Sequence, residues 1–302
     1  LTALALAVLA ERAGIPPGVF NVITGDPPTI GKELTENPTV KCVTFTGSTE
    51  IGKLIMRQAS GTVKKVALEL GGNAPFIVFD DADLDAAVEG LIAAKFRNGG
   101  QTCVCPNRIY VQDAVHDEFV QKLAARVGAL VVGPATDPAS QIGPMINARA
   151  VDKIERHVQD AVKHGARVVV GGKRLSAEGK AGAHYYAPTV LTHVDAAMEC
   201  SCEETFGPIA PVTRFSSEAD VIAAANDTPF GLAAYFYSRD VRRIWRLADE
   251  LESGIVGINE GAVAAEAAPF GGVKDSGYGR EGSTHGLAEY MHIKYLCQGQ
   301  LD

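Results

Sequence analysis

The chain has 302 residues, of which 46% are hydrophobic and 21% are charged, and its formal net charge is −8. This acidic balance, without any Lys/Arg-rich run, argues against nucleic acid or an anionic membrane as a partner. No charge-free apolar run of about 18 residues is present, which argues against a membrane span. The six cysteines are too few for a disulfide framework, so we expect a reducing compartment, either the cytoplasm or the mitochondrial matrix.

Residues 1–10 form an apolar run that predicts a buried helix. A signal peptide is disfavoured because no basic region precedes the run and Gly14 follows it as a C-cap. The chain begins inside this predicted helix without a Met. We therefore expect it to be a fragment of a longer protein.

Further along the chain, short β-rich runs alternate with amphipathic helical runs. Strands are predicted at residues 19–23, 40–45, 63–70, 76–79, 167–170, 212–215, 234–237 and 255–258. Helices are predicted at residues 48–59, 81–97, 115–130, 147–164, 217–225 and 240–251. This alternation predicts an α/β protein with mostly parallel sheets. A Gly- and Pro-rich stretch at 269–282 predicts a long functional loop or a domain crossover, and residues 289–296 predict a terminal strand.

Cys103 and Cys105 lie in the stretch Gly-Gln-Thr-Cys-Val-Cys. A disulfide between them requires a bent backbone, since residues i and i+2 of a strand lie roughly 6.6 Å apart. A zinc site shared with Cys200 and Cys202 lacks the usual ligand spacing and a nearby His, so we predict no metal. A buried free cysteine is often only a small hydrophobe. Cys103, however, follows a predicted helix end at two glycines, on the kind of irregular loop that carries reactive groups, and is the candidate nucleophile.

A candidate base lies upstream, in the stretch Leu-Glu-Leu-Gly-Gly-Asn at residues 68–73. An exposed alternate position is the ordinary place for a glutamate in a strand. Here two glycines follow almost at once, so the strand is expected to end at Glu69. In open α/β sheets, ligands bind beyond the carboxyl ends of strands. A carboxylate at that edge can take a proton from a thiol or from water.

Two turns are candidates for ligand contacts. Residues 45–52 join a predicted strand to a predicted helix, where Ser48 is a good N-cap and Gly47 lets a phosphate approach the backbone N–H groups. An ordinary capped turn would have the same sequence. Glu204 and Phe206 precede a Gly-Pro turn and could contact a sugar and a flat ring, although a solvated acidic turn is the alternative.

Together these stretches resemble the aldehyde dehydrogenase superfamily. The shared motifs, in the family's order, are residues 45–52, 68–75, 96–103, 203–208 and 269–272. The resemblance covers the whole chain and implies an aldehyde dehydrogenase-like α/β fold. It implies the C-terminal part of a Rossmann-like cofactor domain at residues 1–71, a catalytic domain at 72–274, and a crossover loop and oligomerisation tail at 275–302. The terminal strand would then pair with another subunit, in a homodimer or homotetramer.

The resemblance also implies a reaction, the oxidation of an aldehyde with NAD or NADP. Cys103 would attack the aldehyde, the nicotinamide would take the hydride, and Glu69 would activate the water that hydrolyses the thioester. The backbone N–H of Cys103 would help to bind the oxyanion. The implied cofactor contacts are Gly47 and Ser48 at the pyrophosphate, Leu70 near the nicotinamide, Glu204 at its ribose and Phe206 at its ring. Cys105 is the nearest thiol that could resolve an oxidised Cys103.

Within the superfamily, the chain most resembles NAD(P)-dependent succinate-semialdehyde dehydrogenases. The resemblance lies in the Cys-Val-Cys sequence at residues 103–105 and in residues 259–261 and 272–274. In those enzymes an arginine at the place of Arg97 binds the far carboxylate; without the resemblance, an arginine favoured by the helix dipole explains it equally well. Their usual loop serine is missing near Ala264, so glutarate semialdehyde or another aldehyde is an alternative substrate. The family's N-terminal cofactor residues are also missing, so an inactive fragment is a further alternative.

Overall fold

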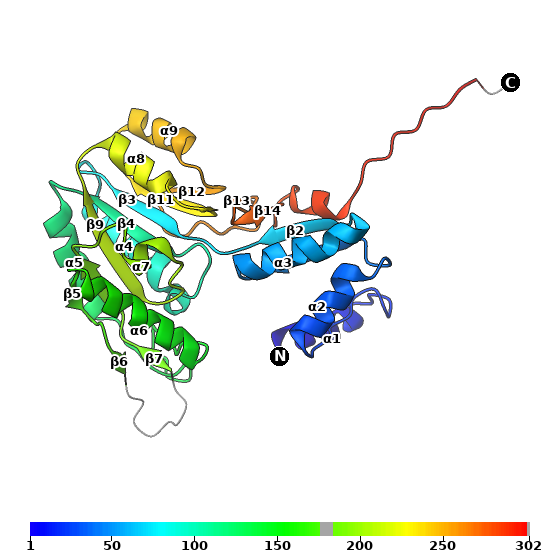
Figure 1. Ribbon diagram of the computed structural model, residues 1–302, viewed down its shortest axis with the longest axis horizontal. Helices are drawn as coiled ribbons and strands as arrows, with labels where there is room; N and C mark the ends of the chain where they lie inside the picture. Colours follow the sequence, from blue (N-terminus) through cyan, green and yellow to red (C-terminus); the bar gives the residue numbers. More distant parts are fainter. Residues whose placement is uncertain (176–183, 301–302) are drawn as a thin grey trace. The chain divides into compact units, whose positions relative to one another are not determined.

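A computed structural model describes residues 1–175 and 184–300 (Figure 1). The chain forms two compact units. One unit contains residues 1–43 and 53–66, and the other contains residues 44–52 and 67–302. The domain boundaries implied by the resemblance, after residues 71 and 274, remain predictions.

The first unit is helical. It contains α1 (Thr2–Arg12), α2 (Pro27–Glu36), most of α3 (Thr49–Ala59) and the short 3-10 helix η1 (Ser60–Thr62). The predicted first helix is present, but the prediction that it is buried is wrong for this chain. None of its residues is buried, and large apolar side chains such as Leu6 and Leu9 are exposed. The strand predicted at residues 19–23 is also absent, since Val19 and Ile23 are exposed and have no strand beside them.

The second unit is built on a seven-stranded sheet. Its strands are β3 (Ala74–Val78), β4 (Pro106–Gln112), β5 (Arg167–Val170), β8 (Thr189–Thr192), β9 (Ile209–Phe215), β11 (Ala233–Tyr237) and β12 (Ile255–Ile258). They lie in the order β12-β11-β3-β4-β9-β8-β5, and every neighbouring pair is parallel except β5 with β8. The prediction of an α/β protein with mostly parallel strands is therefore confirmed.

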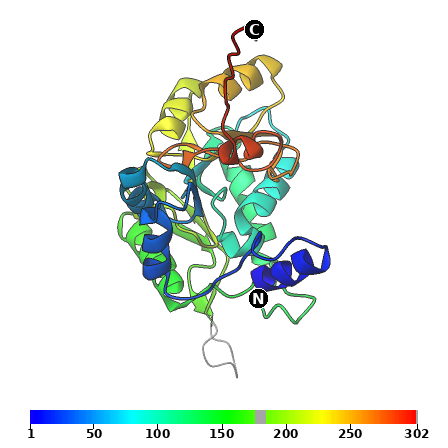
Figure 2. The same cartoon turned by 90° about the vertical axis from the view of Figure 1, so that its right-hand side faces the viewer.

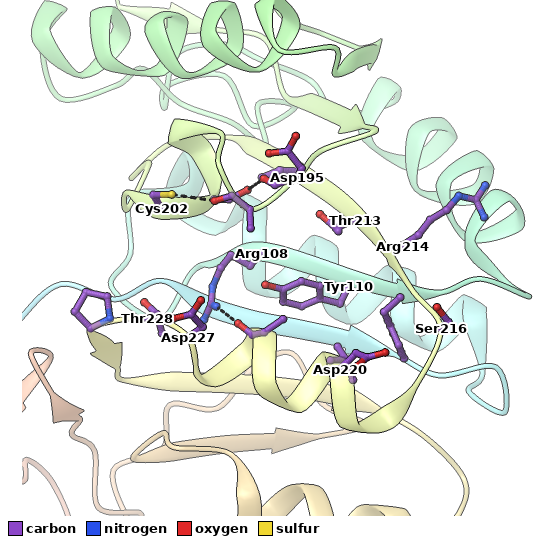
Figure 3. Close-up of a pocket in the computed structure, with 17 residues that line it drawn as sticks. Arg108, Tyr110, Asp195, Cys202, Thr213, Arg214, Ser216, Asp220, Asp227 and Thr228 are labelled. Carbon is purple, nitrogen blue, oxygen red and sulfur yellow. Dashed lines mark hydrogen bonds between the residues drawn. The ribbon is translucent and has the colours of Figure 1, made fainter.

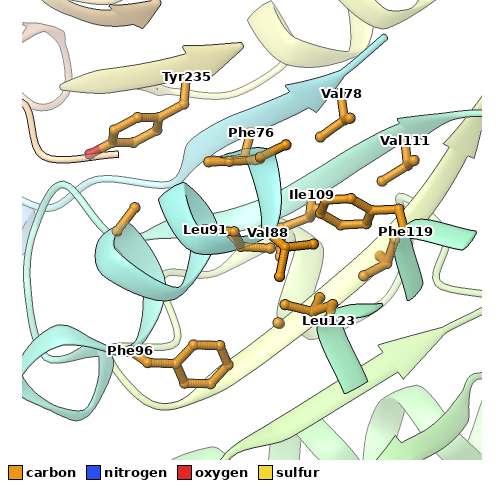
Figure 4. Packing of buried hydrophobic residues seen from close by; sticks show 14 of the residues in the cluster. Phe76, Val78, Val88, Leu91, Phe96, Ile109, Val111, Phe119, Leu123 and Tyr235 are labelled. Atoms are coloured by element: carbon orange, nitrogen blue, oxygen red, sulfur yellow. The ribbon is translucent and has the colours of Figure 1, made fainter. Parts of the chain in front are cut away.

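Helices cover both faces of this sheet. On one face, α4 (Leu84–Phe96) and α5 (His116–Gly128) pack on side chains such as Phe76 and Ile109 (Figure 4). On the other face, α8 (Glu218–Asn226) and α9 (Val241–Glu250) cover Ile77 and Phe236, and α6 (Ala148–Lys163) covers Leu191. Successive residues of a strand point to opposite faces, so neighbours such as Phe76 and Ile77 belong to different cores. In the turned view, α4 (cyan) and α6 (green) lie on opposite sides of the strands (Figure 2).

The remaining elements are short. They are β1 (Cys42–Thr46), β2 (Lys65–Glu69), β6 (Arg174–Leu175), β7 (Tyr185–Tyr186), α7 (Glu199–Cys202), β10 (Phe230–Gly231), β13 (Val273–Lys274), β14 (Gly277–Tyr278), and the 3-10 helices η2 (Arg97–Gly100) and η3 (Gly286–Tyr290). The stretch at 269–282 is thus more than a loop. Its two strands pair antiparallel with β10 and with β2, and the second pair places Gly277 opposite Glu69.

The end of the chain differs from the expected strand. Residues 286–290 form η3, and residues 291–300 have no regular secondary structure and pair with no strand in the described part of the chain. Pairing of this segment with another subunit stays a prediction. No helix within residues 1–175 and 184–300 has the length and apolar character needed to cross a membrane.

Candidate active site

Glu69 and Cys103 reach the same edge of the seven-stranded sheet. Glu69 is the last residue of β2, and five residues later the chain enters β3 at Ala74. Cys103 lies just before β4, which runs parallel beside β3. Because the two strands are parallel, the segments that precede them meet at one edge. The site therefore lies at the carboxyl end of β2, as the sequence predicts, but at the amino ends of the strands of the larger sheet.

The backbone before Cys103 turns sharply. Helix α4 ends at Phe96, and Asn98, Gly99 and Gly100 then adopt positive φ values of 53°, 64° and 76°. Asparagine and glycine tolerate this left-handed conformation better than other residues. A Cβ on Gly100 would also lie 2.2 Å from the carbonyl oxygen of Gly207. The two glycines are thus required by the turn that presents Cys103 and by its close contact with the segment around Gly207.

Gly72 brings the glutamate motif against two other motifs. A Cβ on Gly72 would lie 2.2 Å from the carbonyl oxygen of Cys103, so the two backbones are in direct contact. The Gly72 N–H donates a hydrogen bond of 3.0 Å to Glu204 Oε1. Asn73 extends this contact by donating through Nδ2 to the carbonyl of Ser201 at 2.9 Å. Three of the five sequence motifs therefore converge at Gly72.

The thiol of Cys103 is half-buried and not activated at rest. Burial raises its pKa above the ordinary value, and the nearby Glu204 carboxylate raises it further. The carboxylate of Glu69 acts in the same direction, while the backbone N–H groups of Cys103 and Val104 oppose it. The thiol is therefore protonated at neutral pH. Nucleophilic attack requires a base or a change in the charges around the sulfur.

Glu69 has the properties of such a base. Its side chain is 5% exposed, and burial together with the Glu281 carboxylate raises its pKa to about 7, against the opposing charge of Arg280. Its Oε2 is buried and has no hydrogen-bond partner in the described part of the chain. A base whose pKa lies near the working pH is deprotonated often enough to act and still binds a proton strongly enough to remove one. This carboxylate can therefore take a proton from water or from a thiol.

Glu204 and Phe206 belong to a partly buried turn after α7. The Glu204 carboxyl group has a raised pKa because it is buried, although the Gly72 N–H acts against the shift. Its backbone carbonyl accepts a hydrogen bond from Lys153 Nζ of α6 at 2.5 Å. Phe206 has a φ of 53° and its ring is 40% exposed, so an uncommon backbone conformation presents an accessible aromatic face. The sequence did not identify Lys153, which reaches this turn from 51 residues away.

The turn at residues 45–52 is closely tied to Glu69. The Gly47 N–H donates to the carbonyl of Glu69 at 3.0 Å and is therefore already bonded. Ser48 Oγ accepts from the Ile51 N–H at 3.4 Å, the arrangement of an N-cap at the start of α3. Leu70 is buried and packs so closely on Gly52 that a Cβ there would lie 2.4 Å from its side chain. The N–H groups at the N-terminus of α3 are the candidate phosphate donors at this turn, and the predicted role of Gly47 in letting a phosphate approach stays a prediction.

Arg97 and Cys105 lie on either side of the candidate nucleophile in different environments. The side chain of Arg97 is exposed and makes no hydrogen bond or ion pair with the residues that the structure describes. Cys105 is 1% exposed, its Sγ donates to the carbonyl of Lys95 at 3.4 Å, and burial raises the pKa of its thiol. Lys95 is itself fully buried and donates to Asn107 Oδ1 at 2.8 Å. The two cysteines of the motif are thus not equivalent.

A separate cavity of about 550 Å³ lies over β4 and β9, between α7 and α8 (Figure 3). Its lining includes Arg108 and Tyr110 of β4 but neither Cys103 nor Glu69. Arg108 donates to the carbonyl of Asn73 at 2.9 Å and so connects this cavity to the segment after Gly72. Within residues 1–175 and 184–300, no three His, Cys, Asp or Glu side chains are grouped to hold a metal ion.

Three relatives are similar to almost the whole chain. The succinate-semialdehyde dehydrogenase [NADP(+)] of Escherichia coli (strain K12) is 58% identical over 298 residues, which cover 99% of this chain and 61% of the relative. The glutarate-semialdehyde dehydrogenase of Pseudomonas aeruginosa has the same identity and coverage. The 3-sulfolactaldehyde dehydrogenase of Pseudomonas putida is 56% identical over 302 residues and is matched over 61% of its length. The chain thus spans about three fifths of these relatives.

Solved structures show the same fold. A crystal structure of an E. coli NADP-dependent enzyme has a TM-score of 0.96 and 58% identity, covering 99% of this chain and 61% of that one. The succinate-semialdehyde dehydrogenase of Burkholderia pseudomallei has a TM-score of 0.95 and 58% identity, covering 98% of this chain and 60% of that one. The profile of the Aldehyde dehydrogenase family matches residues 1–296. The chain therefore belongs to the aldehyde dehydrogenase family.

Proposed function

We propose that the full-length protein containing this chain oxidises an aldehyde that carries an anionic group at its far end, with succinate semialdehyde as the first candidate. The observation that carries the proposal is the meeting of Cys103 and Glu69 where β2 ends and where β3 and β4 begin. The backbone of Cys103 contacts the glutamate motif at Gly72. A half-buried thiol beside a carboxyl group whose pKa is about 7 supplies both a nucleophile and a base.

In this proposal, the sulfur of Cys103 bonds to the aldehyde carbon, the thiol proton moves to the aldehyde oxygen, and a thiohemiacetal forms. When bound, the nicotinamide of oxidised NAD or NADP would accept the hydride that the thiohemiacetal loses, while the hydroxyl proton passes to solvent and a thioester remains. Glu69 then takes a proton from water, whose oxygen attacks the resulting thioester and releases Cys103 and the carboxylic acid. The backbone N–H of Cys103 helps to hold the oxyanion in both steps.

The chain offers residues that fit the nicotinamide half of such a cofactor. Glu204 presents a carboxylate, an acceptor suited to ribose hydroxyl groups, and the Gly72 N–H fixes one of its oxygens at 3.0 Å. The exposed ring of Phe206 is two residues away and offers a flat apolar surface. Leu70 lies between the glutamate and Gly72. At the other side of Glu69, Ser48 opens α3, an 11-residue helix whose N-terminus suits a pyrophosphate.

The anionic group of the substrate is assigned to Arg97. The names of the three relatives describe substrates that carry a carboxylate or a sulfonate besides the aldehyde. Arg97 precedes Cys103 by six residues, and its charge is close enough to act on the pKa of Tyr235. Tyr235 in turn donates to the carbonyl of Val104 at 2.8 Å. The absence of a hydroxyl at Ala264 favours glutarate semialdehyde as the second candidate.

Substrate comparison in the full-length protein tests this assignment. The values to compare are kcat/KM for succinate semialdehyde, glutarate semialdehyde and butanal. Arg97→Ala should lower kcat/KM for the two acids by a factor that corresponds to roughly 2–5 kcal/mol, with little change for butanal. Arg97→Lys should restore only part of the loss, because an ammonium group cannot bind a carboxylate in the same bidentate way. The exposed Arg149 provides the matched control, Arg149→Ala.

Two results would contradict the proposal at different levels. If the wild-type protein does not prefer the two acids to butanal, the anionic substrate class is wrong and only general aldehyde oxidation remains. If it oxidises none of the three with NAD or NADP, the dehydrogenase proposal itself fails.

We further propose that Cys105 resolves an oxidised Cys103. Peroxide would oxidise the Cys103 sulfur to a sulfenic acid. The thiol of Cys105 would then attack that sulfur and form a disulfide, and the sulfenic hydroxyl group would leave as water. Cys105 N–H donates to the Thr102 carbonyl at 3.2 Å, so the backbone between the two cysteines is already bent. Peroxide should then inactivate the enzyme, and dithiothreitol should restore it. Equally complete recovery of a Cys105→Ala variant would contradict the resolving role.

A further inference from the structure

One face of α6 is fitted against the segment that carries Glu204. His157 projects from this face and is fully buried. Its ring lies between Thr205, whose Oγ1 is 3.2 Å from Nδ1, and Glu203, whose Oε2 is 3.3 Å from Nε2. The two partners are the residues immediately before and after Glu204. A single imidazole thus contacts both neighbours of the residue assigned to the nicotinamide ribose.

The chemistry of the two partners fixes the direction of both hydrogen bonds. An ionised carboxylate only accepts, so Nε2 must carry the ring proton and donate it to Glu203. The unprotonated Nδ1 then accepts the hydroxyl proton of Thr205. Burial lowers the pKa of His157 to about 4, despite the opposing effect of Glu203. The ring is therefore neutral at physiological pH, the state that both bonds require.

Other side chains of α6 hold the same turn. Arg156 Nη2 donates to Glu203 Oε2 at 3.0 Å, and Lys153 Nζ donates to the Glu204 carbonyl at 2.5 Å. Ile154 packs under Gly207, where a Cβ would lie 2.5 Å from its side chain. The Arg156 contact is at the surface, with its side chain 47% exposed, whereas His157 is inaccessible to water. Water can reach Glu203, whose side chain is 49% exposed, but it cannot replace the buried bond between His157 and Thr205.

We propose that His157 is a positioning residue that holds Glu204 in the orientation that binds the nicotinamide-side ribose. This inference rests on the proposed function, because it takes Glu204 as the ribose contact. His157 touches neither cofactor nor substrate. It acts by fixing the backbone on both sides of Glu204, while the Gly72 N–H fixes the carboxylate itself. Without the ring, the buried hydroxyl of Thr205 loses its partner and the turn is free to rotate the carboxylate away from Gly72.

The experiment compares binding of two ligands to the full-length protein by titration calorimetry. The first is the oxidised dinucleotide that the wild-type enzyme prefers, and the second is ADP, or its 2′-phosphorylated form for an NADP enzyme. The second ligand lacks the ribose and ring assigned to Glu204 and Phe206. The variants are His157→Leu, which removes both bonds, and His157→Gln, whose terminal amide can still donate to Glu203. His164→Leu is the control, since His164 lies at the exposed end of the same helix.

His157→Leu should weaken dinucleotide binding about tenfold, which corresponds to roughly 1.4 kcal/mol. ADP binding should stay unchanged, His157→Gln should recover part of the loss, and His164→Leu should match the wild type. Unchanged dinucleotide binding in His157→Leu would overturn the inference. Equal weakening of ADP and dinucleotide would also overturn it, because the residue would then support only the general fold.

The same titrations separate this inference from the proposed function. A wild-type protein that binds the dinucleotide but oxidises no aldehyde would refute the dehydrogenase proposal and leave the comparison of variants intact. A wild-type protein that binds no dinucleotide would refute both. Steady-state kinetics add a second reading, since a positioning role predicts a higher KM for the dinucleotide at unchanged KM for the aldehyde.

Discussion

Gly72 and Cys103 are in backbone contact, so close that a Cβ on Gly72 would lie 2.2 Å from the carbonyl oxygen of Cys103. The contact joins the glutamate motif to the cysteine motif without any side chain. Gly72 also contacts Glu204, because its N–H donates a hydrogen bond to Glu204 Oε1. The relative placement of Cys103, Glu69 and Glu204, the proposed nucleophile, base and cofactor contact, therefore depends on the absence of one methyl group.

Gly72→Ala should displace the Cys103 backbone and lower both stability and turnover. Overpacking of this kind typically costs about 1–3 kcal/mol. Gly31→Ala is the matched control, because Gly31 lies within α2 and a Cβ there meets nothing within 4 Å. That variant should be neutral or more stable by up to about 1 kcal/mol. Thermal unfolding and kcat of the full-length variants check the pair, and normal turnover in Gly72→Ala would refute the steric argument.

The raised pKa of Glu69 predicts how the stability of the protein changes with pH. Folding raises this pKa from 4.5 to about 7, so the native protein holds a proton that the unfolded chain has lost between those values. The stability contribution is present below pH 4.5 and is lost as the pH rises through about 7. Glu69→Gln removes the titration. Its unfolding free energy, relative to wild type, should therefore rise by on the order of 2 kcal/mol between about pH 5 and about pH 8.

The same group predicts the pH dependence of activity. If Glu69 activates water, kcat of the wild type should rise with pH through an apparent pKa of about 7. In Glu69→Gln, kcat should fall by about 10²–10⁴-fold and should no longer rise with pH near 7. If kcat of the variant still rises through the same apparent pKa, the rise belongs to another group.

The thiol of Cys103 should become more reactive when the charge beside it is removed. Glu204 raises the pKa of this thiol, so Glu204→Gln should lower the pKa and speed alkylation by iodoacetamide at about pH 8. Mass spectrometry of the peptide that contains Cys103 separates this sulfur from the exposed Cys202 and Cys297. Glu118→Gln, on the exposed side of α5, should leave the rate unchanged. An unaltered rate in Glu204→Gln would remove this carboxylate from the account.

The sequence predicted the fold well where hydrophobic periodicity is strong. The strands at 167–170 and 255–258 and the helices α4, α5, α6, α8 and α9 lie within a few residues of their predicted places. Strand β4 was not predicted because it begins with a proline and contains Asn107 and Arg108. Both side chains are buried and bonded across the fold, to Lys95 and to the carbonyl of Asn73 respectively. Such contacts leave no periodic signal in a single sequence.

The candidate site was predictable in its motifs but not in its supports. Glu69 and Cys103 are recognisable because each stands beside paired glycines at the end of an element. His157 and Lys153 lie on an ordinary amphipathic helix, and their roles depend on residues 46 to 51 positions away. The prediction that α1 is buried was also wrong, because none of its residues is buried. In each case tertiary contacts, not local propensity, decided the outcome.

Residues 291–300 make a prediction about assembly. Ile293, Tyr295 and Leu296 are largely exposed, and their segment pairs with no strand in the described part of the chain. An apolar segment of this kind is expected to pair with a strand of another subunit. Deleting residues 288–302 from the full-length protein should convert a dimer or tetramer into monomers or aggregates. Sedimentation velocity measures this, and a wild-type protein that sediments as a monomer would refute the prediction.

The central claim is that Cys103 forms a thioester with the substrate and that Glu69 drives its hydrolysis. The most direct measurement is mass spectrometry of the full-length Glu69→Gln variant, quenched in acid after mixing with succinate semialdehyde and the oxidised dinucleotide. The account predicts a succinyl group on the peptide that contains Cys103, its accumulation above the wild-type level, its absence in Glu69→Gln/Cys103→Ala and its persistence in Glu69→Gln/Cys105→Ala. An acyl group found only on another residue, or none while the dinucleotide is reduced, would contradict the account.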